Sequence, residues 1–121
     1  MENKNLETMS KVSLCEEQVL AVILDSEEHP DLRKAMETVN ERFSKQWKPQ
    51  TVSTFLSRLV KKKVLSMYRK GRYCYYMPEI QKEDYIKMSL LHIANTFLDG
   101  DLSKLQEVLD DLQDNPKSET K

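Results

Sequence analysis

The sequence has little glycine, proline or cysteine. Its 121 residues include two glycines, four prolines and two cysteines. With 39% apolar residues, this composition indicates an ordered and largely helical chain rather than a disordered one. Cys15 and Cys74 lie far apart and neither belongs to a close-spaced pair, which excludes a disulfide framework and a zinc motif. We therefore expect two small, buried, reduced thiols in a cytoplasmic protein.

Long apolar runs and catalytic motifs are also missing. The longest strictly apolar run, Val19–Leu24, is far too short to span a bilayer, and the N-terminus lacks the apolar core of a signal peptide. His29 and His92 are the only histidines, and neither lies in a metal-spaced cluster. There is no glycine-rich phosphate loop. The sequence thus predicts no enzyme, no cofactor, no metal site and no membrane partner.

Acidic residues are absent from one long stretch. The 37 residues from Arg42 to Pro78 contain no aspartate or glutamate, although 32% of the whole chain is charged. The preceding 41 residues carry a net charge of −6 and residues 79–121 carry −5. An ordinary solvated surface would mix the two signs, whereas a block of one sign is typical of a nucleic-acid-binding element. The ten bases are Arg42, Lys45, Lys48, Arg58, Lys61, Lys62, Lys63, Arg69, Lys70 and Arg72.

Apolar periodicity predicts three helices, a hairpin and two further helices. Ser13 and Glu16 have the spacing of a capping box, and the helix that follows, to about residue 24, is expected to bury Cys15, Val19, Val22 and Ile23 and to expose Glu16. Helices are then predicted over 32–45 and 50–63. Strands over 64–69 and 72–77 meet at Lys70-Gly71, where glycine supplies a positive φ. The last helices are predicted over 82–98 and from a cap at Asp101, after Gly100.

This order of elements predicts a mainly α fold with a small β-hairpin wing. Residues 10–79 would form a winged helix-turn-helix domain that binds DNA, and residues 80–115 a C-terminal helical region for dimerisation. The apolar stripes of the last two helices suggest the dimer contact. Its predicted residues are Tyr85, Met88, Leu91, Phe97, Leu102, Leu105, Leu109 and Leu112.

The third predicted helix is suited to reading nucleobases, because short hydroxyl side chains share its polar face with long basic side chains. The hairpin tip carries three basic side chains that folding does not need. Contact with phosphates or the minor groove explains them better than solubility alone. Tyr68, Tyr73, Tyr75 and Tyr76 are expected to pack on the core or on each other, with base stacking the lesser alternative. The predicted DNA-binding residues are Lys48, Gln50, Thr51, Ser53, Thr54, Ser57, Arg58, Lys61, Arg69, Lys70 and Arg72.

Three segments resemble the penicillinase-repressor family (BlaI, MecI and the copper-responsive CopY branch). They are the run from Val12 to Leu20, the run from Lys48-Pro49-Gln50-Thr51 to Lys61-Lys62 and the run from Arg69-Lys70-Gly71-Arg72 to Pro78, and the resemblance covers about residues 10–105. The resemblance implies a homodimeric repressor that binds an inverted-repeat operator in double-stranded DNA, with an inducing protease or sensor as a further, unidentified partner.

The chain departs from that family at three places. Lys63 stands where the family has glycine, Leu91-His92 stands where the β-lactam-responsive members have a cleaved Asn-Phe bond, and the cysteine cluster of the copper branch is absent.

The alternative function is a winged-helix interaction module whose basic face binds an acidic protein.

Overall fold

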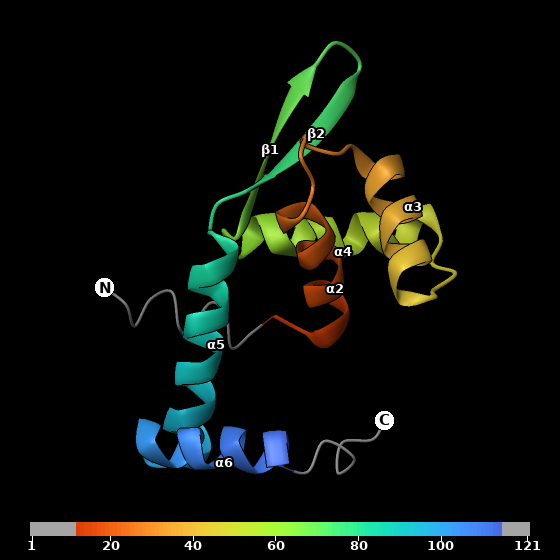
Figure 1. The fold of residues 1–121 in the computed structure, drawn as a ribbon. Coiled ribbons are helices and arrows are strands. Elements are labelled where there is room, and N and C mark those ends of the chain that lie inside the picture. Colours follow the sequence, from red (N-terminus) through yellow and green to blue (C-terminus); the bar gives the residue numbers. More distant parts are fainter. Residues whose placement is uncertain (1–11, 115–121) are drawn as a thin grey trace.

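The computed structural model describes residues 12–114 and consists of helices with one two-stranded sheet (Figure 1). The predicted outer limits at residues 10 and 115 lie outside the described residues. The predicted winged helix-turn-helix order, with two further helices, is confirmed. In chain order the elements are α2 (Leu14–Leu24), α3 (Leu32–Phe43), α4 (Pro49–Lys61), β1 (Leu65–Lys70), β2 (Tyr73–Pro78), α5 (Lys82–Phe97) and α6 (Leu102–Asp114).

The core lies where α2, α3 and α4 meet the base of the hairpin. Apolar residues at spacings of three and four along each helix form one stripe per helix, and the three stripes face one another. These side chains are buried to 4% exposure or less, so the core fixes how α4 is presented to solvent. The members from these three helices, from β1 and from the turn before it are Val19, Leu20, Val22, Ile23, Val39, Val52, Leu56, Leu59, Val64 and Leu65.

The predicted capping box at the start of α2 is present. The Ser13 hydroxyl accepts from the Glu16 amide at 3.1 Å, and the Glu16 carboxylate accepts from the Ser13 amide at 3.2 Å. The predicted inner face of this first turn was wrong, because Cys15 is exposed and Glu16 is 2% exposed. Glu16 faces α4, which carries its counter-charge, whereas Cys15 lies on the solvent side. Cys74 is half-buried, so the expectation of two buried thiols was wrong as well.

The turn between α3 and α4 is held by one side chain. The α3 helix ends at Phe43, two residues before the predicted end, because Ser44 adopts a left-handed conformation with φ 55°. The Asn40 side-chain amide donates to the Trp47 carbonyl and accepts from the Trp47 amide, both at 3.0 Å. The Trp47 ring then packs edge-on against Phe55, with the ring centroids 5.1 Å apart. These contacts fix the angle between the two helices.

The α4 helix also ends two residues earlier than predicted, at Lys61. Lys63 has φ 69°, a left-handed conformation that lets the Lys63 amide donate to the Val60 carbonyl at 3.0 Å and the Val64 amide donate to the Leu59 carbonyl at 3.2 Å. These two bonds form a Schellman motif, which usually has glycine at the left-handed position. Lysine therefore serves here where a residue without a side chain is the common choice.

The hairpin is shifted by one residue from its prediction. Leu65 pairs with Pro78 and Lys70 pairs with Tyr73, so the two-residue turn is Gly71-Arg72 rather than Lys70-Gly71. Gly71 has the expected positive φ, 68°. The base of the wing is tied to the loop before α3, since the Tyr76 amide donates to the Pro30 carbonyl at 2.9 Å.

The last two helices lead away from the winged helix (Figure 1). The start of α5 packs on the core, where the Tyr85 hydroxyl donates to Glu17 at 2.7 Å. Burial and this hydrogen bond raise the pKa of Tyr85. The helix ends at Phe97, one residue earlier than predicted, and Gly100, with φ 75°, donates to the Ala94 carbonyl at 2.9 Å. The α6 helix lies across the far end of α5, with Asp101 accepting from the Ser103 amide at its start.

Candidate nucleic-acid interface

The outward face of α4 is polar along its whole length. Gln50, Thr54, Ser57 and Lys61 recur at intervals of four, three and four residues, which places them in one row along the helix. The buried side chains of α4 lie on the opposite side. Thr51 and Ser53 are half-buried at the two edges of the row. The row therefore combines short side chains, which let a helix approach closely, with one long base at its end.

The hydroxyl of Thr54 is partly committed to the helix itself. It donates to the Gln50 carbonyl at 3.0 Å. Because its proton is used in this bond, Thr54 can accept a hydrogen bond from a base edge but is a poor donor.

The N-terminus of α4 leaves backbone amides uncapped. Lys48 is the N-cap residue, it makes no side-chain capping hydrogen bond, and Pro49 occupies the first helical position. The amides of Gln50 and Thr51 consequently point out of the helix end beside the Lys48 side chain. Such an end attracts an anion through the unpaired N–H groups and the helix dipole.

Arg58 lies at the edge of the polar row and leans toward α2. Its Nη1 atom is 3.8 Å from Glu16 Oε2, and its side chain is 57% exposed. Lys62, the C-cap residue of α4, donates from Nζ to Glu16 Oε1 at 2.6 Å and is 24% exposed. Sequence reasoning missed this acidic neighbour, since Glu16 was expected to face solvent.

The wing presents its bases at the tip. Arg69, Lys70 and Arg72 are all exposed, next to the Gly71 turn. Three of the tyrosines pack as expected. The rings of Tyr68 and Tyr75 lie 5.7 Å apart across the hairpin. Tyr76 packs against the core, and its burial raises its pKa. Tyr73 is 54% exposed beside the tip.

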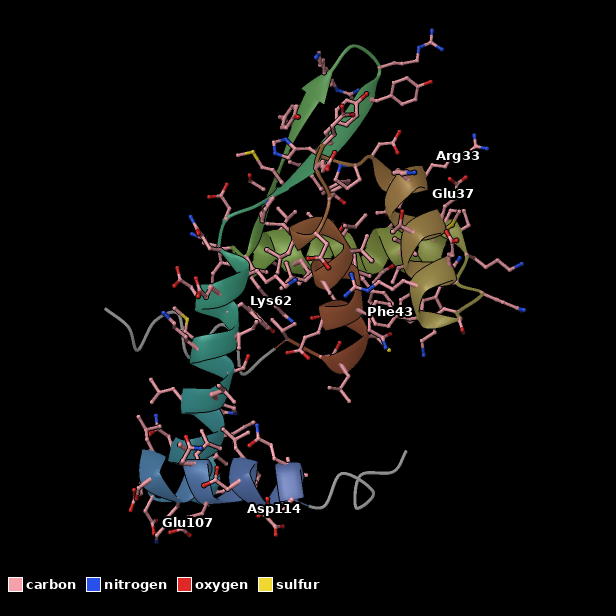
Figure 2. The ribbon with its side chains drawn as sticks, viewed as in Figure 1. Arg33, Glu37, Phe43, Lys62, Glu107 and Asp114 are labelled. Atoms are coloured by element: carbon pink, nitrogen blue, oxygen red, sulfur yellow. The ribbon has the colours of Figure 1, made fainter. Side chains whose placement is uncertain are left out.

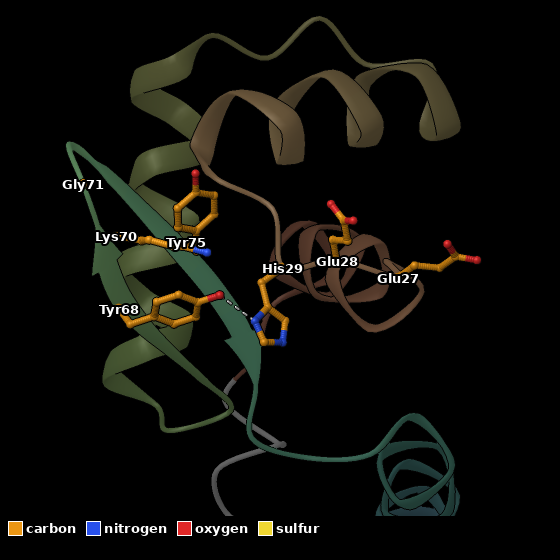
Figure 3. A pocket seen from close by; sticks show the side chains of 7 residues that line it. All are labelled: Glu27, Glu28, His29, Tyr68, Lys70, Gly71 and Tyr75. Atoms are coloured by element: carbon orange, nitrogen blue, oxygen red, sulfur yellow. Dashed lines mark hydrogen bonds between the residues drawn. The ribbon is translucent and has the colours of Figure 1, made fainter.

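A shallow depression separates the wing from the loop before α3 (Figure 3). The His29 ring and Tyr68 both line it, with 2.9 Å between His29 Nδ1 and the Tyr68 hydroxyl. Glu27 and Glu28 lie on the loop side and Lys70 on the wing side. This contact links the wing to the loop and so supports the position of the basic tip.

Tertiary contacts neutralise part of the basic block. Arg42 donates to Asp25 at 2.7 Å, while Arg58 and Lys62 face Glu16. Hydrogen bonds from Lys82 and then Arg42 hold the pKa of Asp25 below its usual value. Within residues 12–114, no carboxylate lies at ion-pair distance from the other seven basic residues of the stretch from Arg42 to Pro78. The uncompensated charge is therefore concentrated at the two ends of α4 and on the wing tip.

The predicted dimerisation residues fall into two groups. Tyr85 and Leu105 are buried within the chain, and Met88 packs against the winged-helix core. The others are exposed, from 37% for Leu91 to 76% for Phe97. Sequence reasoning did not include two further exposed apolar residues of α5, Ile86 and Ile93.

Other kinds of site find no support in the part of the chain that the structure describes. Residues 12–114 contain no group of three or more His, Cys, Asp or Glu side chains that could hold a metal ion. No helix among these residues is long and apolar enough to cross a membrane.

The three-helix core, the polar outer face of α4 and the basic hairpin define a winged helix-turn-helix protein. The sequence model of the penicillinase-repressor family matches residues 12–119. The chain therefore belongs to the penicillinase-repressor family, whose members are repressors rather than enzymes.

Individual relatives agree with this placement. The penicillinase repressor of Bacillus licheniformis is 37% identical over 59 residues, which are 49% of this chain and 46% of that protein. The match thus spans about half the length of that relative. The solution structure of the DNA-binding domain of the repressor BlaI is 29% identical, with a TM-score of 0.53, and the match covers 62% of this chain and 88% of that one.

Two further solved structures are similar. Monomeric Bacillus licheniformis BlaI in complex with the blaP half-operator has a TM-score of 0.51 at 29% identity, covering 62% of this chain and 88% of that one. The complex structure of hsRosR-S1 has a TM-score of 0.58 at 15% identity and covers 91% of this chain and 96% of that one, a likeness of fold alone.

Proposed function

We propose that this protein is a cytoplasmic, sequence-specific DNA-binding transcriptional repressor that acts as a homodimer on an inverted-repeat operator. The observation that carries the proposal is the outer face of α4, where Gln50, Ser57 and Lys61 are exposed and where, within residues 12–114, no carboxylate lies at ion-pair distance from Lys48 or Lys61. A relative with the same fold, BlaI, has been solved in complex with a half-operator.

In this proposal α4 enters the major groove. Gln50, Thr54 and Ser57 would meet base edges, and Arg58 is long enough for a bidentate contact with guanine. Thr51 and Ser53 would lie at the edges of the contact, close to the sugar-phosphate backbone. The uncapped amides at the start of α4, together with Lys48, would bind one phosphate, and Lys61 would bind another at the opposite end of the helix.

The wing would extend the contact beyond the groove. Arg69, Lys70 and Arg72 would reach phosphates or the minor groove beside the site, which adds affinity without sequence information. Because α5 and α6 lead away from α4, an apolar contact between the C-terminal helices of two chains would leave both recognition helices free. The two half-sites would then lie one helical turn apart, about 34 Å, or a multiple of that distance.

The decisive experiment is selection of bound sequences from a random duplex pool. We expect an inverted repeat with half-sites at helical spacing. Arg58→Ala should then weaken binding to the selected duplex by about 1–3 kcal/mol and relax the preference at one position per half-site. Fluorescence anisotropy with the selected duplex and single-base variants measures both effects.

The control for Arg58→Ala is Lys104→Ala, which removes one positive charge from an exposed position of α6. It should leave binding unchanged. A pool that yields no sequence preference, with binding to an acidic protein that duplex DNA does not compete for, would replace this proposal by the interaction-module alternative.

A further inference from the structure

Glu16 is the one charged residue in the buried set of residues 12–114, and it lies against the DNA-facing helix. Its carboxylate is almost inaccessible, yet it accepts from the Ser13 amide at 3.2 Å and from Lys62 Nζ at 2.6 Å. A buried carboxylate must be paired and hydrogen-bonded to be tolerated. The two contacts supply that, and the second joins the first turn of α2 to the C-cap of α4, where Lys62 lies (Figure 2).

The second carboxylate oxygen of Glu16 faces Arg58. The distance of 3.8 Å from Arg58 Nη1 is too long for a hydrogen bond but short enough for a direct electrostatic attraction. Lys62 holds Glu16 in place from the other side, so the carboxylate is a fixed charge rather than a mobile one. This fixed charge attracts the guanidinium of Arg58 toward α2, while the 57% exposure of that side chain leaves it free to reach outward.

We infer that Glu16 is a positioning residue for DNA recognition, because it holds Arg58 in a limited range of directions and offsets the positive charge at the end of α4. This inference rests on the proposed function. It has two consequences. A restrained Arg58 loses less rotamer freedom when it binds a base, which favours the specific sequence. The carboxylate beside Arg58 and Lys62 also weakens the general attraction of these two side chains for phosphate, which lowers non-specific DNA binding.

The sharpest test uses the double variant Glu16→Gln/Lys62→Gln. It replaces the ion pair by two amides and leaves the net charge of the chain unchanged, so any general charge effect is removed. Glutamine is also compatible with the capping box at this position. We expect the ratio of affinities for the selected duplex and a scrambled duplex to fall by about three- to tenfold, from the rotamer freedom regained by Arg58.

A double-mutant cycle separates positioning from simple bracing of the fold. If Glu16 acts through Arg58, then Arg58→Ala should reduce the affinity ratio less in the double variant than in the wild type. A brace that only stabilises α2 against α4 would lower the melting temperature without any such coupling. An unchanged affinity ratio, or full additivity with Arg58→Ala, would overturn the inference.

The single variant Glu16→Gln keeps the test valid if the double variant does not fold. It should bind scrambled duplex more tightly and steepen the dependence of log K on log[salt] by up to about one unit. Glu107→Gln, with the same change in net charge on α6, is the matched control and should alter neither quantity. Equal behaviour of the two single variants would contradict the inference, whereas a wild-type protein without sequence preference would overturn the proposed function itself.

Discussion

Single residues in unusual environments mark the two ends of α4, the proposed recognition helix. At its start, the Lys48 side chain makes no capping hydrogen bond and Pro49 has no backbone N–H group. The amides of Gln50 and Thr51 therefore face outward. At its end, Lys63 adopts the left-handed conformation that the Schellman motif requires. For an L-residue with a side chain this conformation costs about 1–2 kcal/mol relative to the right-handed helix. This cost gives a physical reason why glycine would be favoured at this position in the family that the chain resembles.

Lys63→Gly should therefore relieve backbone strain. The gain is offset by the larger conformational entropy of glycine in the unfolded chain, about 0.5–1 kcal/mol. We expect a net increase in the free energy of unfolding of up to about 1 kcal/mol, measured by urea denaturation. Lys63→Ala removes the same charge but keeps the Cβ atom, and it should not stabilise. A Lys63→Gly variant less stable than Lys63→Ala would contradict this prediction, because the strain relieved would then be smaller than the entropy cost of glycine.

At the scale of elements, the wing is a two-stranded ribbon that depends on its base. Such a hairpin is marginal by itself and is stabilised by what it packs against. Here the hydrogen bond from the Tyr76 amide to the Pro30 carbonyl and the His29–Tyr68 contact hold the wing against the loop before α3. The tip of the wing projects beyond these contacts. Charge at the tip contributes little to this packing, which separates the function of the tip from the stability of the wing.

Lys70→Ala and Arg72→Ala should accordingly weaken binding to selected and scrambled duplexes by the same factor. Each should also reduce the slope of log K against log[salt] by about one unit, since each removes one phosphate contact. Titrations at four or five salt concentrations measure the slope, and thermal unfolding should be unchanged. A loss confined to the selected duplex would assign these residues to base reading instead.

For the whole molecule, the open question is what covers the exposed apolar faces of α5 and α6. Phe97 is 76% exposed and Leu102 is 56% exposed, and both lie at the junction of the two helices, away from the winged helix. Tyr85 and Met88, in contrast, pack against the chain's own core. The proposed dimer contact therefore lies toward the far end of α5 and along α6.

Phe97→Asp should weaken the dimer by at least about tenfold, or 1.4 kcal/mol, because association would bury an unpaired charge. Sedimentation velocity across a micromolar concentration series measures the shift toward monomer. Thr96→Asp places the same charge on the neighbouring exposed position and should have a smaller effect. A wild-type chain that is monomeric throughout the series would contradict the dimer.

The sequence by itself determined the order of the elements and the position of the basic block. Apolar spacing identified α2, α3 and α4, Gly71 and the alternating tyrosines identified the hairpin, and the Ser13–Glu16 spacing identified a cap that is present. These features are local, because a few neighbouring residues fix the backbone and the periodicity of each segment. Helix ends were less predictable, since Ser44 and Lys63 take left-handed conformations that their residue types do not announce.

Only the tertiary structure decided which charges face each other. The stretch from Arg42 to Pro78 has no acidic residue in the chain order, yet Asp25 and Glu16 reach it from α2 and engage three of its ten bases. The sequence placed Glu16 on a polar helix face, and the packing of α2 against α4 buried it. Electrostatic interactions depend on distance in space, so a one-sign block in the sequence becomes a partly compensated surface whose free charge lies at the ends of α4 and the tip of the wing.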